Sequence, residues 1–389
     1  DRRQRQMCIR DRTETMLSKK GAEYMNSLKI PKDSVVVSCL ATIGKVGITT
    51  RDSFTNQQIN SLICDKSKVM ALWVYYYFKI NTHYLDSLGG GGSVYTNISK
   101  SKFKNALISL PPLPEQRAIA KILSDLDSKI ELNQQMNKTL EAIGQAIFKH
   151  WFIDFEFPNE EGKPYKSSGG EMVYNEELGK EIPKGWRVGR LGEFGKIQPG
   201  FAFKSSDFVK EGVGLIKIKN INKSGVVNLD FEDFLSKEVF EKTDKKFYLY
   251  SGDIIIAMTG AEIGKVGVLP KIEKPLLLNQ RVGKVVSDYK YFIYLFLKSD
   301  YCQSLIKGIS SASSAQGNVS NSDIEKIPFI IPDKRILEKF NKLINGIYIK
   351  TFENLGQNIT LSAIRDSLLP KLMSGKIRVP LEVVKERKD

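Results

Sequence analysis

Residues Pro111–Trp151 read PPLPEQRAIAKILSDLDSKIELNQQMNKTLEAIGQAIFKHW, and this stretch decides the fold. After the opening prolines, about ten helical turns follow in which Gly144 is the one helix-weakening residue. Apolar residues recur there at steps of mostly three and four, the spacing of one face of an α-helix. The stretch therefore predicts one long helix with an apolar stripe.

Two asparagines, Asn133 and Asn137, interrupt the stripe near its middle. An asparagine in a helix seam costs stability but can fix the register and the choice of partner. The stretch alone fits two interpretations equally well. It is either a single surface helix lying on a domain or one member of a helix pair.

An internal repeat decides between them. The pattern NxxxNxTLxAI occurs at 133–143 and again at 354–364. Four further matches keep the same order and a separation of about 220 residues. They are IGKVG at 43–47 and 263–267, Asn-Gln at 56–57 and 279–280, Asn-x-Ser at 97–99 and 318–320, and PEQR at 114–117 with PDKR at 332–335. The chain is thus two copies of one unit, and this period is too long for a solenoid.

Each copy is predicted to be a mixed α/β (α+β) domain followed by a long helix, the second helix running over 334–369 and ending at Pro370. We expect the two helices to pair as an antiparallel coiled coil about a pseudo-twofold axis. Some 30 residues of helix span about 45 Å, a little more than one turn of duplex DNA. The predicted pairing residues are Ile119, Leu123, Leu126, Ile130, Asn133, Asn137, Leu140 and Ile147 in the first helix, and Phe340, Ile344, Ile347, Asn354, Asn358, Leu361 and Leu368 in the second.

Short β-branched runs predict strands at 34–38, 61–64, 214–218, 253–257 and 281–286, and apolar runs predict helices at 70–78 and 289–307. Small residues at 310–314 predict a loop. We divide the chain into 1–13 (without periodicity, and suspected to be non-native or a fragment end), a first domain at 14–110, a helix at 111–151, a polar linker at 152–181, a second domain at 182–331, a helix at 332–376 and a tail at 377–389. The repeat places Trp186 opposite a position before Asp1, so we expect the first domain to be incomplete.

The composition favours a polyanionic partner. The formal net charge is +15, which suggests nucleic acid, although many basic proteins bind none. Four cysteines without CxxC spacing indicate a reducing, cytoplasmic setting, and two histidines exclude a histidine-rich metal site. No apolar run approaches about 18 residues and no signal peptide is visible, so we expect no membrane association.

The sequence carries no catalytic motif that we can identify. GAEIGK at 260–265 is one residue short of a phosphate loop, and Val266 stands where a hydroxyl would meet Mg²⁺. Neither GxSxG, HExxH nor the Asn-Pro-Pro-Tyr of amino-methyltransferases occurs. Asp253, Glu262 and Lys265 could form a nuclease-like set, but a strand-start aspartate and a solvated turn explain them more simply. We predict no catalytic and no metal-binding residue.

Several segments suit DNA binding instead. The glycine-flanked lysines of the two IGKVG turns can approach phosphates, and the asparagine and glutamine side chains can pair with base edges. Lys217 and Lys219 are expected on one strand face. The candidates are Lys45, Asn56, Gln57, Gln58, Lys196, Phe201, Lys204, Lys217, Lys219, Lys265, Asn279, Gln280 and Arg281. The alternatives are tight turns, capping asparagines and an ordinary solvated face.

Over nearly the whole chain after Thr13, the sequence resembles the specificity subunits of type I restriction–modification systems. The resemblance rests on PLPEQR at 112–117 with its long helix, Gly185-Trp186, GDIII at 252–256 leading into GKVG at 264–267, and LLPKLMSG at 368–375. It implies two target-recognition domains that each read half of a split DNA site, and two helices that set the spacing between the half-sites.

The resemblance also implies the partners. Catalysis would lie in separate subunits: two methyltransferase subunits docked on the helices and their ends, and restriction subunits that join this core. S-adenosylmethionine, ATP and Mg²⁺ would be bound by these partners and no cofactor by this chain. The rival interpretations are a non-catalytic coiled-coil scaffold, an unrelated DNA-binding protein, and an enzyme with motifs that are not visible.

Overall fold

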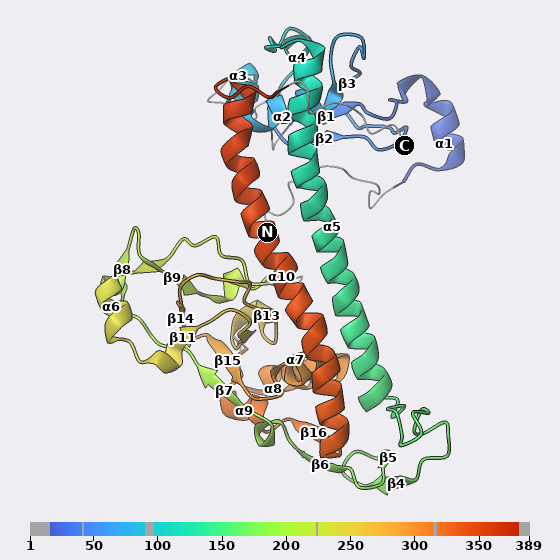
Figure 1. Cartoon of the computed structure of the whole chain (residues 1–389), viewed down its shortest axis with the longest axis vertical. Coiled ribbons are helices and arrows are strands. Elements are labelled where there is room, and N and C mark those ends of the chain that lie inside the picture. Colours follow the sequence, from blue (N-terminus) through green and yellow to red (C-terminus); the bar gives the residue numbers. More distant parts are fainter. Residues whose placement is uncertain (1–15, 41–42, 90–96, 223–224, 314–316, 381–389) are drawn as a thin grey trace. The chain divides into compact units, whose positions relative to one another are not determined.

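The computed structural model describes residues 16–40, 43–89, 97–222, 225–313 and 317–380 (Figure 1). They form two compact units. The first comprises 1–132 with 358–389, and the second comprises 133–357. The suspected segment 1–13 lies outside the described residues.

The first unit is built on a three-stranded antiparallel sheet in the order β2-β1-β3. The register places Val36 of the central strand between Gly47 and Ser61. Its elements are α1 (Lys19–Tyr24), β1 (Val35–Ser38), β2 (Val46–Ile48), β3 (Ile59–Leu62), α2 (Ala71–Ile80), α3 (Thr82–Leu88) and α4 (Lys100–Lys104). The buried helix predicted at 70–78 is α2, and Trp73 and Phe78 form the core with Val35 and Val37.

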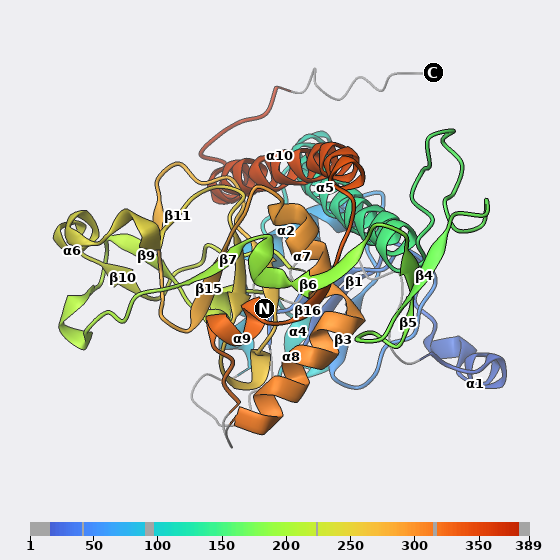
Figure 2. The ribbon, with the colours of Figure 1, turned by 90° about the horizontal axis from the view of Figure 1, so that it is seen from below.

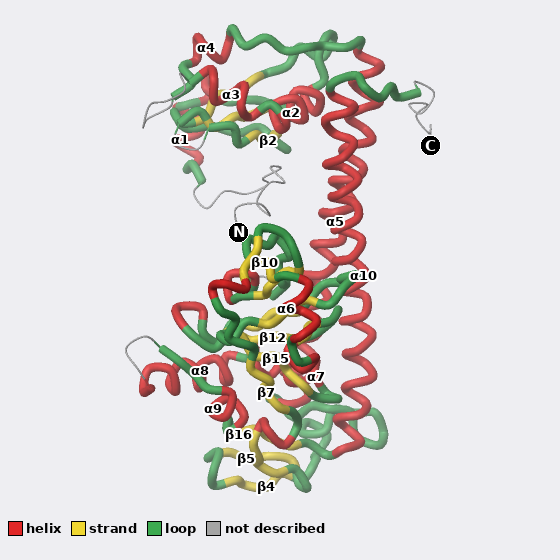
Figure 3. Tube along the Cα trace, turned by 90° about the vertical axis from the view of Figure 1, so that its left-hand side faces the viewer, coloured by secondary structure: helices red, strands yellow, loops and turns green. Residues whose placement is uncertain are grey.

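The second unit holds a larger set of sheets (Figure 3). One four-stranded antiparallel sheet has the order β13-β12-β15-β7, and a five-stranded sheet has the order β11-β14-β9-β10-β8 with β14 and β9 parallel. The strands are β6 (Arg187–Arg190), β7 (Lys196–Pro199), β8 (Phe208–Val209), β9 (Val213–Ile216), β10 (Phe234–Leu235), β11 (Tyr248–Leu249), β12 (Ile254–Ala257), β13 (Val266–Val268), β14 (Leu276–Leu278), β15 (Val282–Val286) and β16 (Pro328–Ile331). The helices are α6 (Lys237–Lys242), α7 (Lys290–Lys298), α8 (Asp300–Ser313) and α9 (Asn321–Glu325).

Helix α7 forms the centre of the second unit. All seven residues from Tyr291 to Leu297 are buried, as expected for a helix that is apolar on every side. Its core cluster includes Phe148 and Phe340 from the long helices and Ile254 from β12. This helix therefore joins the sheet to the long helices.

The long helices are α5 (Leu113–Phe152) and α10 (Lys334–Met373), and segments of both belong to each unit. In the second unit Asn137 contacts Asn354, while the Phe152 and Phe340 rings are 4.8 Å apart. Residues later in α5 thus contact residues earlier in α10, so the two helices run in opposite directions. The predicted antiparallel pairing is confirmed. In the first unit Asp127 of α5 faces Arg365 of α10.

The fifteen predicted pairing residues differ in burial, and none is exposed. The buried ones are Ile119, Leu123, Ile130, Asn133, Phe340, Ile344 and Asn354; the half-buried ones are Leu126, Asn137, Leu140, Ile147, Ile347, Asn358, Leu361 and Leu368. The Nδ2 of Asn354 donates to the Oδ1 of Asn137 at 2.8 Å, and that of Asn133 to Gln357 at 3.2 Å. Asn137 and Asn354 therefore bond each other across the helix pair, and the Asn133 amide donates to Gln357 of α10.

Three predictions about helix ends are wrong. The helix expected at 289–307 is two helices, because the Ser299 backbone leaves the helical conformation and its hydroxyl donates to the Phe296 carbonyl. Helix α8 continues to Ser313, so the loop expected at 310–314 is helical over its described residues. Pro370 lies inside α10, where burial of Leu369 and Leu372 offsets the lost backbone hydrogen bond.

The structure also differs from the sequence-based prediction in one strand and in the linker at 152–181. The strand expected at 61–64 is β3 at 59–62. The interval expected to be a polar linker contains a hairpin of β4 (Met172–Asn175) and β5 (Lys180–Pro183) that leads into β6 (Figure 2). Phe157 in the same interval is buried and stacks on Trp186 at 4.8 Å, so this part of the chain is ordered by aromatic packing.

Candidate nucleic-acid interface

The repeated motifs meet at one place in the first unit, the carboxyl end of the central strand β1. The Ser38 N–H donates to the Lys45 carbonyl, and the Cys39 N–H donates to the Gln58 carbonyl, both at 2.9 Å. The Ile98 N–H donates to the Cys39 carbonyl at 3.0 Å. The IGKVG turn, the Asn-Gln turn and the Asn-x-Ser segment thus converge, although they are far apart in the sequence.

The second unit repeats this arrangement at the end of β12. The Ala257 N–H donates to the Lys265 carbonyl (2.9 Å), and the Met258 N–H donates to the Arg281 carbonyl (3.1 Å). The Val319 N–H donates to the Met258 carbonyl (3.0 Å). The duplication has therefore preserved one cluster of turns in each unit.

The asparagines of these clusters form the turns themselves. The Oδ1 of Asn56 accepts from the Gln58 N–H at 3.1 Å, and the Oδ1 of Asn279 accepts from the Arg281 N–H at 3.2 Å. This is an Asx-turn in both units. Gln57, Gln58, Gln280 and Arg281 are exposed on the same turns, so these four side chains are the better placed to meet base edges.

The two IGKVG turns share a backbone and differ in charge. Gly44 and Gly264 have φ of +84° and +79°, a conformation that favours glycine. Lys45 is exposed, whereas Lys265 forms an ion pair with Glu262 at 2.8 Å and its side chain is 20% exposed. Lys45 is therefore the stronger candidate for a phosphate contact.

Phe201 joins the cluster of the second unit through the backbone. Its N–H donates to the Leu278 carbonyl at 2.9 Å, and its carbonyl accepts from the Gln280 N–H at 3.0 Å. A Cβ on Gly200 would lie 2.2 Å from the Asn279 carbonyl oxygen, so this approach requires glycine.

An aromatic group surrounds Phe201. Phe201 is 43% exposed, and its ring lies 5.0 Å from the Phe203 ring and 5.1 Å from the Phe247 ring, measured between centroids. The Lys246 Nζ is 5.1 Å from the Phe247 ring. Lys204 is exposed nearby in the sequence. Aromatic faces beside cations suit contact with bases and phosphates.

The other predicted lysines lie elsewhere. Lys196 is exposed opposite Val286 at the start of β7, at the other end of the strand from Phe201. The prediction that Lys217 and Lys219 share a strand face is wrong, because β9 ends at Ile216 and a 3₁₀ turn follows. Both ammonium groups lie 2.8 Å from Asp233, and Lys219 also lies 2.8 Å from Glu232, so two carboxylates offset the two positive charges.

The comparisons with known proteins agree with this duplicated geometry. The family model "Type I restriction modification DNA specificity domain" matches the chain twice, over residues 7–142 and 183–359. This chain belongs to that family. It is 33% identical to the MjaIX specificity subunit of Methanocaldococcus jannaschii, over 95% of this chain and 83% of the relative. The HindI specificity subunit of Haemophilus influenzae is 27% identical over 73% of this chain and 72% of its own length.

A solved structure supports the same fold. The S subunit of a type I restriction–modification system from M. genitalium matches with a TM-score of 0.57 and 20% identity, covering 88% of this chain and 83% of that one. Type I specificity subunits are the non-catalytic, DNA-recognising members of their systems, so this subunit is not an enzyme in its own right.

The environments of Cys302 and Asp253 do not favour a catalytic role. Burial raises the pKa of the Cys302 thiol to about 12, which makes it a poor nucleophile. Burial also raises the pKa of Asp253, whose carboxylate accepts from the Tyr250 N–H. Within the described ranges no histidine, cysteine and carboxylate group gathers into a metal site, and no helix is long and apolar enough to cross a membrane.

Sequence reasoning missed the aromatic partners of Phe201. Phe203 lies in KIQPGFAFK at 196–204, next to the predicted Phe201 and Lys204, and Lys246 and Phe247 lie in the segment DKKFYLY at 244–250. Both segments place lysines next to aromatic residues, and this pattern could have identified Phe203, Lys246 and Phe247 as candidates.

Proposed function

We propose that this specificity subunit recognises a bipartite double-stranded DNA site, with one half-site read by the turn cluster of each unit. The observation that carries the proposal is the convergence of the same three repeated motifs at the end of β1 and at the end of β12. Repeated motifs that meet at one exposed end of each domain are placed like a binding surface, and the net charge of +15 suits a polyanion.

Site selection tests this function. The chain, bound to its methyltransferase subunits, is incubated with a random duplex library and the retained DNA is sequenced. We expect two short specific half-sites separated by a fixed non-specific spacer. If the retained DNA shows no preferred sequence, the subunit does not recognise a specific site and the scaffold interpretation is favoured.

We further propose that the subunit docks two methyltransferase subunits, joined by restriction subunits, in the cytoplasm. S-adenosylmethionine, ATP and Mg²⁺ would then be held by these partners. A matched pair of exposed apolar residues supports two equivalent docking points. Ile143 of α5 and Ile364 of α10 occupy the same position of the repeat and are 42% and 44% exposed.

The docking proposal predicts a change in stoichiometry. Ile143→Asp or Ile364→Asp alone should reduce the methyltransferase content of the purified complex from two copies to one, as measured by analytical ultracentrifugation, and the double variant should bind none. Ile349→Asp is the control, because Ile349 is 56% exposed on α10 but its repeat counterpart is the polar Ser128. Two bound copies in the double variant would exclude these positions as the docking points.

A further inference from the structure

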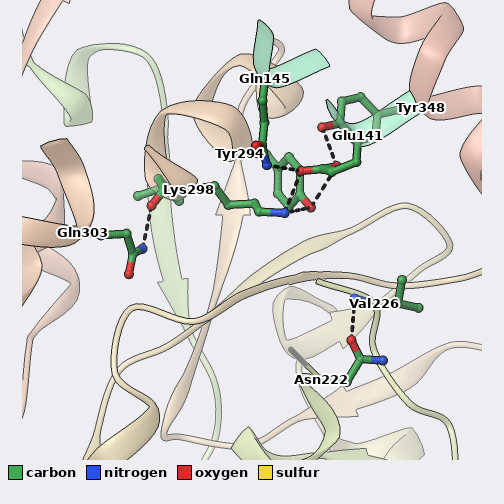
Figure 4. A network of polar contacts seen from close by, with 9 residues as sticks. Glu141, Gln145, Asn222, Val226, Tyr294, Lys298, Gln303 and Tyr348 are labelled. Carbon is green, nitrogen blue, oxygen red and sulfur yellow. Dashed lines mark hydrogen bonds and ion pairs between the residues drawn. The ribbon is translucent and has the colours of Figure 1, made fainter. Parts of the chain in front are cut away.

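A carboxylate in the second unit connects three helices (Figure 4). The Oε1 of Glu141 on α5 accepts from the Lys298 Nζ of α7 at 2.6 Å. Its Oε2 accepts from the Tyr348 hydroxyl of α10 at 3.1 Å and from the Tyr294 hydroxyl of α7 at 3.4 Å. Gln145 adds a bond of 2.9 Å to Oε1 from the next turn of α5.

This network is largely removed from water. The side chains of Glu141 and Lys298 are 20% and 22% exposed. Burial and the neighbouring Glu141 charge hold the pKa of the Tyr294 hydroxyl well above its usual range, so the phenol remains a donor. A buried ion pair adds little net stability over an apolar replacement, but its directional bonds can select one arrangement of the elements that it joins.

The first unit has a counterpart at the corresponding place. The Tyr76 hydroxyl of α2 donates to the Oδ2 of Asp127 on α5 at 2.8 Å, and the Lys79 ammonium of α2 lies 3.8 Å from the same oxygen. Arg365 of α10 donates to the Oδ1 of Asp127 at 2.7 Å. In each unit, therefore, a tyrosine of the buried helix donates to a carboxylate on α5, which also bonds α10.

The matching positions of the repeat carry different side chains. The repeat offset places Asp127 opposite Tyr348, and Arg365 opposite Gly144. A Cβ on Gly144 would lie at an ordinary contact distance of 3.6 Å from the Tyr348 hydroxyl, so this phenol lies beside the position that matches the guanidinium of the first unit. The two sites thus preserve a connection while using different groups.

We propose that Glu141 is a positioning residue for DNA recognition. Through Lys298, Tyr294 and Tyr348 it fixes the orientation of α7, and with it the turn cluster of the second unit, on the adjoining segments of α5 and α10. Glu141 therefore restricts the spacer length that the subunit accepts and does not contribute to the sequence of the half-site. The inference rests on the proposed function, because it requires the second unit to read a half-site.

The test compares spacer tolerance in variants. Complexes of the full chain with its methyltransferase subunits are given the selected site with its spacer lengthened or shortened by one base pair. For Glu141→Ala we expect discrimination between the correct and the altered spacer to fall about tenfold, with both half-site sequences unchanged. Glu353→Ala is the matched control, because it removes an exposed ion pair with Lys350 (3.0 Å) in the same unit.

A second variant separates positioning from folding. Glu141→Gln combined with Lys298→Met removes both charges and retains an acceptor for the two phenols, so it should fold even if Glu141→Ala does not, and it should relax the spacer by a smaller factor. Full spacer discrimination in a folded Glu141 variant, or an altered half-site sequence, would overturn the inference. If the unmodified chain selects no bipartite site, the proposed function itself has failed.

Discussion

Each unit bonds its buried helix to a carboxylate on α5, but the first unit adds a cation from α10 that the second unit does not use. In the first unit Asp127 pairs with Arg365 of α10 at 2.7 Å and with Lys79 of α2 at 3.8 Å, so its ion pairs join the two long helices and also the domain. In the second unit the partner of Glu141 is Lys298 of α7, so the ion pair joins the domain to α5. The comparison teaches that the two units keep a carboxylate contact between the buried helix and α5 although the carboxylates stand at different positions of the repeat.

The largest expected effect comes from breaking the ion pair of the first unit. Asp127→Ala removes a carboxylate that is 11% exposed. It leaves the Arg365 side chain, 15% exposed, paired with the exposed Asp366, and it also removes the carboxylate 3.8 Å from the Lys79 ammonium. Loss of one partner of a buried pair costs about 3–5 kcal/mol. Urea unfolding of the first unit should show this loss in the free energy of unfolding.

The control lies two residues away on the same helix. Asp125 pairs with Lys121 at 2.8 Å, but the side chains are 63% and 54% exposed. Asp125→Ala should lower the free energy of unfolding by less than about 0.5 kcal/mol. Equal losses in the two variants would contradict the role given to Asp127.

The seam asparagines give an intermediate effect. In the second unit the Asn137–Asn354 bond of 2.8 Å is a neutral contact between the long helices. Asn354→Leu leaves the Asn137 amide facing an apolar side chain, at a cost of about 1–3 kcal/mol, and adding Asn137→Leu should recover most of it. A double-mutant cycle by thermal unfolding measures this coupling, and additive losses would show that the pair does not act as a unit.

A smaller, pH-dependent effect is expected at Asp233. Hydrogen bonds from Lys217 and then Lys219 hold the pKa of this carboxyl below its usual range. The stabilisation is therefore present above the unfolded-state pKa of about 4 and is lost as the pH falls through the lower folded-state value. The side chain is 23% exposed, so Asp233→Asn should flatten the acid limb of the stability profile by no more than about 1 kcal/mol. An unchanged acid limb would show that the two lysines do not stabilise the carboxylate.

The smallest effect compares the two glycine-flanked lysines. Lys45→Ala should reduce the slope of log affinity against log salt by about 0.9, the value for one phosphate contact. Lys265→Ala should change it less, because Glu262 already pairs with that ammonium. Filter binding to the selected site at several salt concentrations measures both slopes. A larger change in the slope for Lys265→Ala than for Lys45→Ala would show that Lys265 makes the stronger phosphate contact.

The duplication, the long helices and the buried α2 could be predicted from the sequence because each is a long or repeated pattern. Where Ser299 divides a helix, or where burial of Leu369 and Leu372 keeps Pro370 inside one, tertiary packing overrides the local signal. The sequence selected the turn residues of the candidate interface, but it did not distinguish Lys45 from Lys265, since the difference lies in the ion pair with Glu262. The Glu141 network joins three distant segments, and no local pattern predicts such a contact.

The central claim is that paired helices set the distance between two half-site readers. One heptad inserted at matching positions of α5 and α10 preserves the pairing faces and adds about 10 Å of helix, equal to at most about three base pairs of DNA. Site selection with this variant should return the same two half-sites with a longer spacer. An unchanged spacer would contradict the claim.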